Sequence, residues 1–247
     1  TYSFDEIKNI IGIDEYFEIK KEGNWEGKII LKELKLPPKE IIEELKKIRS
    51  KKNKPFFDNK IQLDLNSLWI SALIFADTAI PDQGYLSQAE ELHQKMEEFF
   101  CKDKLFHTSS KSYVFIEDYA FYINCLIDLY EKTLNSKYRI KAIEIVKKAI
   151  NKFYIDDKSI FQKNELKMND LFYRPIDIGD HTIPNGNSIM LMNFARLGFK
   201  KEAKVLANSL NGYLNVYKVF MISSVKSIDY FNQIESGKSC NSEGCSI

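Results

Sequence analysis

The stretch RPIDIGDHTIPNGNSIMLMNFARL, residues 174–197, sets a polar loop containing glycines and prolines directly before an apolar, helix-like segment. Two further apolar segments open in the same manner, one after the polar residues that follow Asp58 and one after Glu117. Within these segments apolar residues recur at the three- and four-residue spacings of an α-helix face. The sequence therefore predicts three apolar helices that begin near residues 64, 117 and 186.

Each predicted apolar helix has a more polar successor, over Tyr85–Phe100, Tyr138–Phe153 and Lys200–Leu210. Gly198 precedes the third of these, where a glycine ends a helix favourably. Hairpins that join an apolar inner helix to an amphipathic outer one are typical of an α/α toroid, in which inner helices are packed on all sides. Their uneven spacing argues against a strict solenoid repeat. We therefore expect an all-α fold, an α/α toroid that is shortened or incomplete.

The domain organisation follows from the length of the chain and the position of these hairpins. A chain of 247 residues that is 44% hydrophobic is long enough for one large domain. We expect a single domain over residues 1–247, with an N-terminal extension at 1–38 that holds a short strand, helical hairpins at 39–210, and an irregular segment at 211–247. The hairpin part begins with a charged surface helix over Lys39–Arg49, and residues 213–231 are expected to be extended.

Charge and hydropathy exclude several classes of partner. Thirty-six Lys and Arg against 35 Asp and Glu give a net charge of +1, so no overall field favours nucleic acid or an anionic membrane. No window reaches the roughly 18 uncharged apolar residues of a membrane span. We expect a cytoplasmic protein that does not bind nucleic acid or a membrane.

The four cysteines are too few for a disulfide scaffold. Cys101 and Cys125 lie in apolar helical contexts, where reduced, buried thiols are common. Cys240 and Cys245 lie in a short polar tail and could form a metal or redox pair, but no second pair of ligands accompanies them. We therefore predict no metal and no cofactor.

Five sets of residues form an ordered series of motifs. They are Gly23-Asn24-Trp25-Glu26-Gly27, Asp58-Asn59-Lys60 with Asn66, Phe115 to Phe121, Arg174-Pro175 with Pro184 to Ser188, and the Cys240 to Cys245 tail. Together they resemble the YyaL-like thioredoxin-domain-containing proteins over most of the chain. The resemblance implies an α/α toroid similar to six-hairpin glycosidases and to N-acylglucosamine 2-epimerases, in a family whose own activity is largely uncharacterised.

The sequence also departs from that family pattern. Phe56 and Asn59 stand where the family has a histidine and a second aspartate, and Leu65-Asn66-Ser67 stands where it has Trp-Asn-Gly. The Cys-x-x-Cys motif of a thioredoxin-like domain does not occur, so a redox role tied to that domain has no residues here.

Carboxylates gather where the inner helices are expected to begin. In a toroid these N-termini share one mouth of the ring, where helix dipoles and free backbone N–H groups also point. A carboxylate pair for glycoside chemistry could come from six residues, which are Asp58, Asp64, Glu117, Asp118, Asp177 and Asp180. The alternative for Asp64 and Asp118 is that they act only as helix caps or first-turn acids. Arg174 could clamp a site carboxylate such as Asp177, or form a plain structural ion pair.

The three histidines limit the reactions that remain. His181 alone lies in a motif, whereas His107 lies in a loop before the second inner helix and His93 is expected at the surface of an outer helix. Sugar epimerisation by histidine acid–base chemistry would therefore need a carboxylate or tyrosine as the partner of His181. Among the aromatic residues, Trp25 is the stronger candidate for stacking on a sugar ring, and Trp69 is predicted to pack in the core.

The resulting hypothesis is a carbohydrate-related cleft that binds a sugar, hydrolyses a glycoside or epimerises a sugar. We predict catalytic roles for Asp58, Asp118 and His181. The predicted sugar-binding residues are Trp25, Lys60, Asn66, Glu117, Tyr119, Arg174, Asp177 and Asn187. The alternative is a non-catalytic helical scaffold or degenerate homologue, in which the polar residues cap and fasten helices and function lies in a protein partner.

Overall fold

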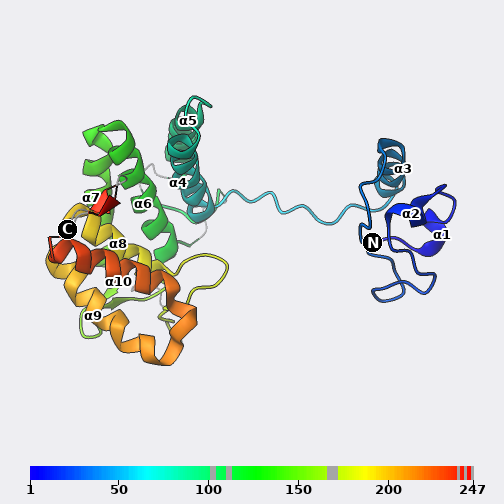
Figure 1. Ribbon diagram of the computed structural model, residues 1–247. Coiled ribbons are helices and arrows are strands. Elements are labelled where there is room, and N and C mark those ends of the chain that lie inside the picture. Colours follow the sequence, from blue (N-terminus) through cyan, green and yellow to red (C-terminus); the bar gives the residue numbers. More distant parts are fainter. Residues whose placement is uncertain (101–103, 110–112, 166–171, 238–239, 242–243, 246–247) are drawn as a thin grey trace. The chain divides into compact units, whose positions relative to one another are not determined.

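The computed structural model describes residues 1–100, 104–109, 113–165, 172–237, 240–241 and 244–245 (Figure 1). The chain forms two compact units, Thr1–Asn59 and Lys60–Ile247, where the sequence predicts one domain. The boundary between them falls inside the stretch 39–210 that the sequence assigns to the helical hairpins. The charged helix at its start therefore belongs to the first unit.

The first unit has a small core of its own. Its helices are α1 Phe4–Ile7, α2 Ile13–Tyr16 and α3 Lys39–Ser50. The predicted surface helix is confirmed as α3, which buries Ile41 and Leu45, one turn apart, against Ile7 and Ile29. Where the sequence predicts a strand near residues 23–33, the backbone instead forms a tight turn with isolated bridges, such as the one that pairs Tyr2 with Ile29.

The second unit contains the three predicted hairpins. Its helices are α4 Leu63–Ala79, α5 Tyr85–Phe100, α6 Ile116–Thr133, α7 Ser136–Phe153, α8 Gly186–Leu197, α9 Lys200–Tyr217, the 3-10 helix η1 Lys218–Met221 and α10 Ile222–Glu235. Two short antiparallel pairs complete it, β1 Tyr154–Ile155 with β2 Ile160–Phe161 and β3 Cys240–Asn241 with β4 Gly244–Cys245. The predicted all-α class is confirmed, and Gly198 ends α8 in the left-handed conformation, as expected of a glycine C-cap.

The apolar members of the hairpins form an inner row. Helix α4 packs on α6, α6 on α8, and α8 on α10, while α5, α7 and α9 each pack on the preceding inner helix. At the start of α8, a Cβ on Gly186 would lie 2.8 Å from Cγ2 of Ile116. Glycine is therefore needed for the first turn of α8 to lie directly against the first turn of α6.

One inner helix is not enclosed on all sides. In α4, Leu65, Trp69 and Phe75 are 47%, 59% and 76% exposed. Within the described residues α4 packs on α5 and α6, and no other helix makes a comparable contact with it. The prediction that Trp69 packs in the core is therefore wrong, because helical spacing identifies an apolar stripe but not what covers it.

Two further predictions are corrected by the second unit. Residues 213–231 are helical rather than extended, and the region 211–247 expected to be irregular contains the end of α9, η1 and α10. The buried residues of α10, Ser224, Ser227 and Phe231, recur at helical spacing against the rest of the core, whereas its apolar Val225 is exposed. His93 is buried rather than at the surface, with its ring stacked on that of Tyr122 and edge-on to that of Tyr138.

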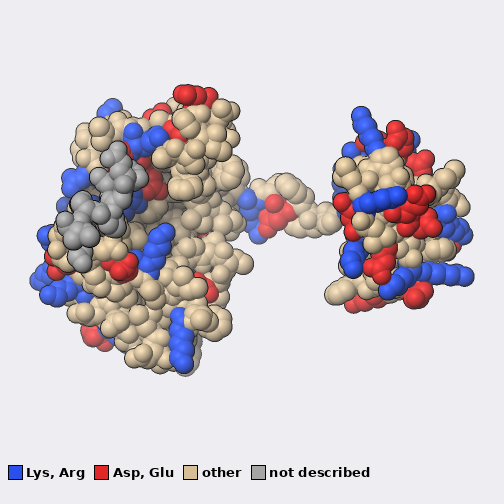
Figure 2. Space-filling model, viewed as in Figure 1, with Lys and Arg blue, Asp and Glu red and all other residues tan. Residues whose placement is uncertain are grey.

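The surface and the cysteines agree with simpler expectations. Lys and Arg side chains are interspersed with Asp and Glu on the face shown in Figure 2. None of the helices in the described residues is both long and apolar enough to cross a membrane. Cys125 is a buried thiol, as predicted, and it donates to the backbone oxygen of Tyr122, while Cys101 lies outside the described residues.

Candidate functional site

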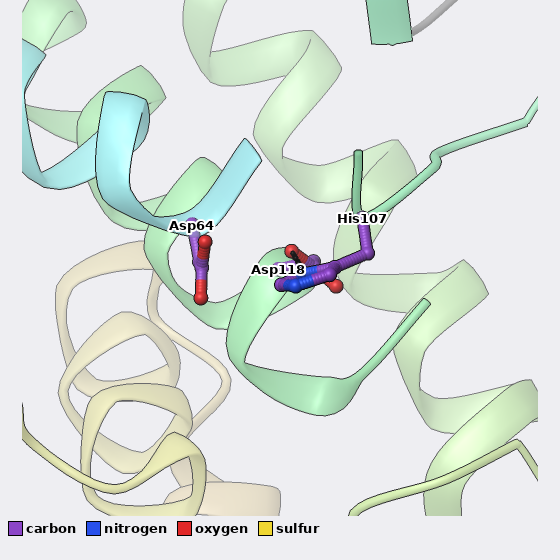
Figure 3. Close-up of side chains that lie close together, drawn as sticks. All are labelled: Asp64, His107 and Asp118. Atoms are coloured by element: carbon purple, nitrogen blue, oxygen red, sulfur yellow. Dashed lines mark hydrogen bonds and ion pairs between the residues drawn. The ribbon is translucent and has the colours of Figure 1, made fainter. Parts of the chain in front are cut away.

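Three polar side chains meet where the inner helices α4 and α6 begin. Asp64 lies in the first turn of α4, Asp118 in the first turn of α6, and His107 in the loop that precedes α6 (Figure 3). Nδ1 of His107 lies 2.9 Å from Oδ1 of Asp118. One nitrogen or oxygen from each of the three residues lies within 4.8 Å of the others.

Backbone hydrogen bonds fix this cluster. Oδ2 of Asp118 accepts the N–H of Phe115, 2.8 Å away, and Oδ1 of Asp64 accepts the N–H of Leu65 at 2.8 Å. The backbone oxygen of His107 accepts the N–H of Leu63 at 2.9 Å, which ties the loop to the start of α4. Asp118 is thus a helix-capping residue and Asp64 a first-turn acid, as one alternative had it, but each also has a second oxygen that is not used by the backbone.

The electrostatics of the cluster follow from burial and proximity. Burial raises the pKa of Asp64, and the neighbouring Asp118 raises it further. The hydrogen bond to Asp118 raises the pKa of His107, although partial burial acts in the opposite direction. The cluster therefore favours a proton or another cation between its carboxylates.

Glu117 lies beside the cluster in the same turn of α6 and is only 8% exposed. Burial raises its pKa to about 7, although the positive charge of Lys163 opposes that rise. Nζ of Lys163 lies 3.9 Å from Oε1 of Glu117 and 3.1 Å from Oδ2 of Asp177. Within the described residues, Oε2 of Glu117 is buried and has no hydrogen-bond partner. A buried carboxyl group with one unused oxygen is a candidate functional group.

Backbone contacts explain why Lys163 lies at this point. Its carbonyl oxygen accepts the N–H of Ile116 at 3.0 Å, and its own N–H donates to the oxygen of Pro175 at 2.8 Å. Lys163 thus joins the start of α6 to the loop that contains Arg174 and Asp177. Asp177 also lies 3.7 Å from the ring of His181, which is 75% exposed at the edge of this group.

Two residues of the same loop and helix serve the fold. Asn187 is fully buried, and its amide exchanges hydrogen bonds with the N–H and oxygen of Phe161 and donates to the oxygen of Asp177. Asp180 accepts hydrogen bonds from Asn185 and from the N–H of Ser223 at the start of α10. The Nδ2 group of Asn187 already donates to the backbone oxygens of Phe161 and Asp177, so it has no hydrogen left for the predicted contact with a sugar.

The remaining predicted residues are spread more widely. Tyr119 is buried and packs edge-on against Phe153 in the core. Asn66 donates to the backbone oxygen of Gln62 at 2.7 Å, and Lys60 is exposed at the start of the second unit. Asp58 and Trp25 belong to the first unit, so the structure does not place them at this cluster.

Sequence reasoning missed Lys163 and Gln62, and it gave His107 no role. Nε2 of Gln62 lies 3.0 Å from Nε2 of His107, on the side of the ring opposite Asp118. The available signal was weak, because His107 is separated from Asp118 by a loop whose path depends on its pairing with the start of α4. Asp64, His107 and Asp118 are also the residues that could hold a metal ion among those described.

Comparison with known proteins gives one sequence relative and several structures. No family model matches the sequence. An uncharacterised protein of Caenorhabditis elegans is 27% identical over 182 residues, covering 68% of this chain and 25% of that protein. The chain thus spans about a quarter of the relative that it matches.

The similar structures are sugar-processing enzymes. Cellobiose 2-epimerase of Bacillus thermoamylovorans has a TM-score of 0.51 at 12% identity, over 73% of this chain and 62% of that chain. A glycoside hydrolase family 76 mannosidase of Bacteroides thetaiotaomicron has a TM-score of 0.56 at 13% identity, over 72% and 56%. An α-mannanase of the same glycoside hydrolase family and organism has a TM-score of 0.55 at 13% identity, over 95% and 68%.

These similarities concern the fold, since the identities are low. The chain spans about six-tenths of the length of the first two structures. The chain has the α/α-toroid fold of the six-hairpin glycosidase-like proteins.

Proposed function

We propose that the beginning of α6 and its surroundings bind a sugar and act on it by acid–base chemistry. The observation that carries the proposal is Glu117, a buried carboxyl group whose Oε2 has no hydrogen-bond partner in the described part of the chain and whose Oε1 faces Lys163. Perturbed, buried carboxyl groups are typical of acid–base catalysts. The sugar-processing enzymes with the same fold support a carbohydrate as the substrate class.

Two reactions fit these groups. In glycoside hydrolysis, Glu117 would donate a proton to the leaving oxygen, while His107 or Asp64 would take a proton from the attacking water. In epimerisation, the base would remove a proton from the carbon beside a carbonyl group, and an acid would return one to the opposite face. Arg174, Asp177 and His181 are the proposed ligands of the sugar hydroxyls.

The wider family assignment is also a proposal. Only the ordered sequence motifs support a relationship to the YyaL-like proteins, since no family model matches the chain. The α/α-toroid fold agrees with that relationship without distinguishing it from other toroid families.

A thermal-stability assay with a panel of mono- and disaccharides, amino sugars and sugar phosphates tests the proposal. A ligand at 100 times its dissociation constant adds about 2.7 kcal/mol to the free energy of unfolding. We expect one sugar class to raise the melting temperature of the wild-type chain, and we expect Glu117→Gln to abolish turnover of that sugar. Glu144→Gln is the matched control, because Glu144 lies on the exposed side of α7 and pairs with Lys148. Turnover that persists in Glu117→Gln would show that Glu117 is not the acid of the reaction.

A second candidate function is a scaffold for a protein partner. The exposed apolar side of α4, with Leu65, Trp69 and Phe75, favours it because exposed apolar patches commonly mark contact surfaces. A photocrosslinking amino acid at position 69 should then capture one defined protein that the same group at exposed position 151 does not. Failure of every sugar to stabilise the chain, together with such a capture, would favour the scaffold.

A further inference from the structure

We propose that Asp64, His107 and Asp118 bind one divalent first-row transition-metal ion, with zinc as the best fit. The proposal goes beyond the sugar chemistry described above, since neither the sequence nor the similar proteins assign a metal to this chain. It also replaces one part of that chemistry, because Asp64 and His107 cannot act as the base of the hydrolysis while they bind an ion. It rests on donor chemistry, on distances, and on the balance of buried charge.

The donor set suits a transition metal. One imidazole nitrogen and two carboxylate oxygens are ligands that zinc accepts, and three protein ligands with a free position are typical of catalytic zinc sites. Magnesium and calcium prefer oxygen donors throughout, so the contribution of His107 discriminates against them.

The distances are near those of a metal site but need adjustment. Ligand bonds of about 2.0 to 2.2 Å place donor atoms roughly 3.3 to 3.6 Å apart around a tetrahedral ion. Nδ1 of His107 and Oδ1 of Asp118 lie 2.9 Å apart, and the whole set falls within 4.8 Å. Figure 3 shows the three side chains gathered between the starts of α4 and α6. Binding of one ion would therefore require the donor atoms of the more widely separated pairs to move closer together.

The buried negative charge at this point is only partly balanced by protein cations, because His107 pairs with Asp118 alone among the three carboxyl groups. Asp64, Glu117 and Asp118 are 8%, 8% and 0% exposed, and all three lie close to His107. The ammonium group of Lys163 lies 3.9 Å from Glu117, but the Lys163 side chain is 37% exposed and also pairs with Asp177. A buried carboxyl group must either take up a proton or be paired with a cation. Independently, the buried Oε2 of Glu117 has no hydrogen-bond partner among the described residues, which indicates that a group that binds these carboxyl groups is missing.

Neighbouring groups already orient each ligand. Oδ2 of Asp118 and Oδ1 of Asp64 are held by backbone N–H groups, which leaves Oδ1 and Oδ2, respectively, for the ion. With Nδ1 of His107 on the metal, the proton shared with Asp118 would leave, and Nε2–H would donate to Gln62 once that side-chain amide turns over. Metal-binding histidines commonly have such an outer partner, and its loss typically reduces affinity about 10- to 100-fold.

Zinc binding to the full chain is the direct test. The starting protein carries Cys240→Ser and Cys245→Ser, because the tail thiols could bind zinc on their own. Isothermal titration with zinc chloride should show one site per chain. We expect Asp64→Asn and His107→Ala each to weaken binding by about 100-fold or more, and Gln62→Ala to weaken it by roughly 10- to 100-fold. His181→Ala is the matched control, since it removes an exposed imidazole outside the cluster and should leave the affinity unchanged.

Several results would overturn the site. Zinc affinity that survives both Asp64→Asn and His107→Ala would place the ion elsewhere, and the absence of saturable binding would remove the proposal altogether. Magnesium binding of equal affinity would refute the assignment to a transition metal. If circular dichroism shows that His107→Ala does not fold, the near-isosteric Asp64→Asn decides the question, together with Gln62→Ala. Because the readout is binding rather than turnover, a failed sugar assay leaves this test unaffected.

Discussion

Replacement of Asn187 by alanine should destabilise the second unit strongly. Oδ1 of Asn187 accepts the N–H of Phe161 at 2.9 Å, and its Nδ2 donates to the oxygens of Phe161 and Asp177 at 2.9 and 3.0 Å. The side chain thus fastens β2 and the preceding loop to the first turn of α8. Each hydrogen bond contributes about 1 kcal/mol, and each buried group left unpaired adds a penalty of about 1 to 3 kcal/mol.

The expected loss for Asn187→Ala is therefore roughly 3 to 6 kcal/mol, because some of the freed backbone groups will find water. For a unit of this size each kcal/mol lowers the melting temperature by about 2 to 4 °C, so we expect a decrease of about 6 to 24 °C. Circular dichroism during heating, checked by urea unfolding, measures it. Asn151→Ala on the exposed side of α7 is the control and should change the free energy by less than about 0.5 kcal/mol. A melting temperature for Asn187→Ala within about 2 °C of the wild type would refute the fastening role.

Three further predictions concern packing, an ion pair and pH. Gly186→Ala places a Cβ 2.8 Å from Cγ2 of Ile116 and should lower stability by about 1 to 3 kcal/mol in urea unfolding, with a smaller loss in an Ile116→Ala background. Asp128 is largely buried and lies 2.6 Å from the guanidinium of Arg196 in the wild-type chain, so Arg196→Met leaves it without its cation. The free energy of unfolding should fall by about 3 to 5 kcal/mol, and an unchanged urea midpoint would contradict this. Burial lowers the pKa of His93, so the folded chain keeps this ring neutral, and stability should fall as pH drops below the ordinary histidine value near 6.5. In His93→Phe the melting temperature should depend less on pH between pH 8 and 5.5 than in the wild type. Parallel profiles of melting temperature against pH for the two proteins would show that His93 does not cause the loss of stability at low pH.

The hairpins could be predicted because their signal is local. The three- and four-residue spacing in α4, α6 and α8 depends on which face of each helix is apolar, and each helix begins within a residue of its predicted start. The positions of Glu117 and Asp118 in the first turn of α6 follow in the same way. The spacing does not show which elements cover each face of a helix. For this reason it predicts a buried Trp69, whereas no other helix covers that side of α4 in the described part of the chain.

The side-chain partners of the site could not be read from the sequence. His107 reaches Asp118 because its loop is hydrogen-bonded to the start of α4, and Lys163 reaches Glu117 because its backbone is bonded to Ile116 and Pro175. Asn187 shows the opposite case. A buried asparagine that bonds to backbone groups and one that binds a ligand have the same sequence signature, and only the positions of Phe161 and Asp177 distinguish them.

The inner row also bears on cooperativity. Each inner helix packs mainly on the next inner helix of the row and on the outer helix of its own hairpin. The free energy of unfolding of the second unit is therefore approximately a sum of hairpin terms and nearest-neighbour interfaces. A hairpin in the middle of such a row must lose two interfaces to open, whereas the end hairpin of α4 and α5 needs to lose one. Amide hydrogens of α4 should therefore exchange with solvent faster than those of α6, and the ligand groups of Asp64 and Asp118 would separate whenever that end of the row opens.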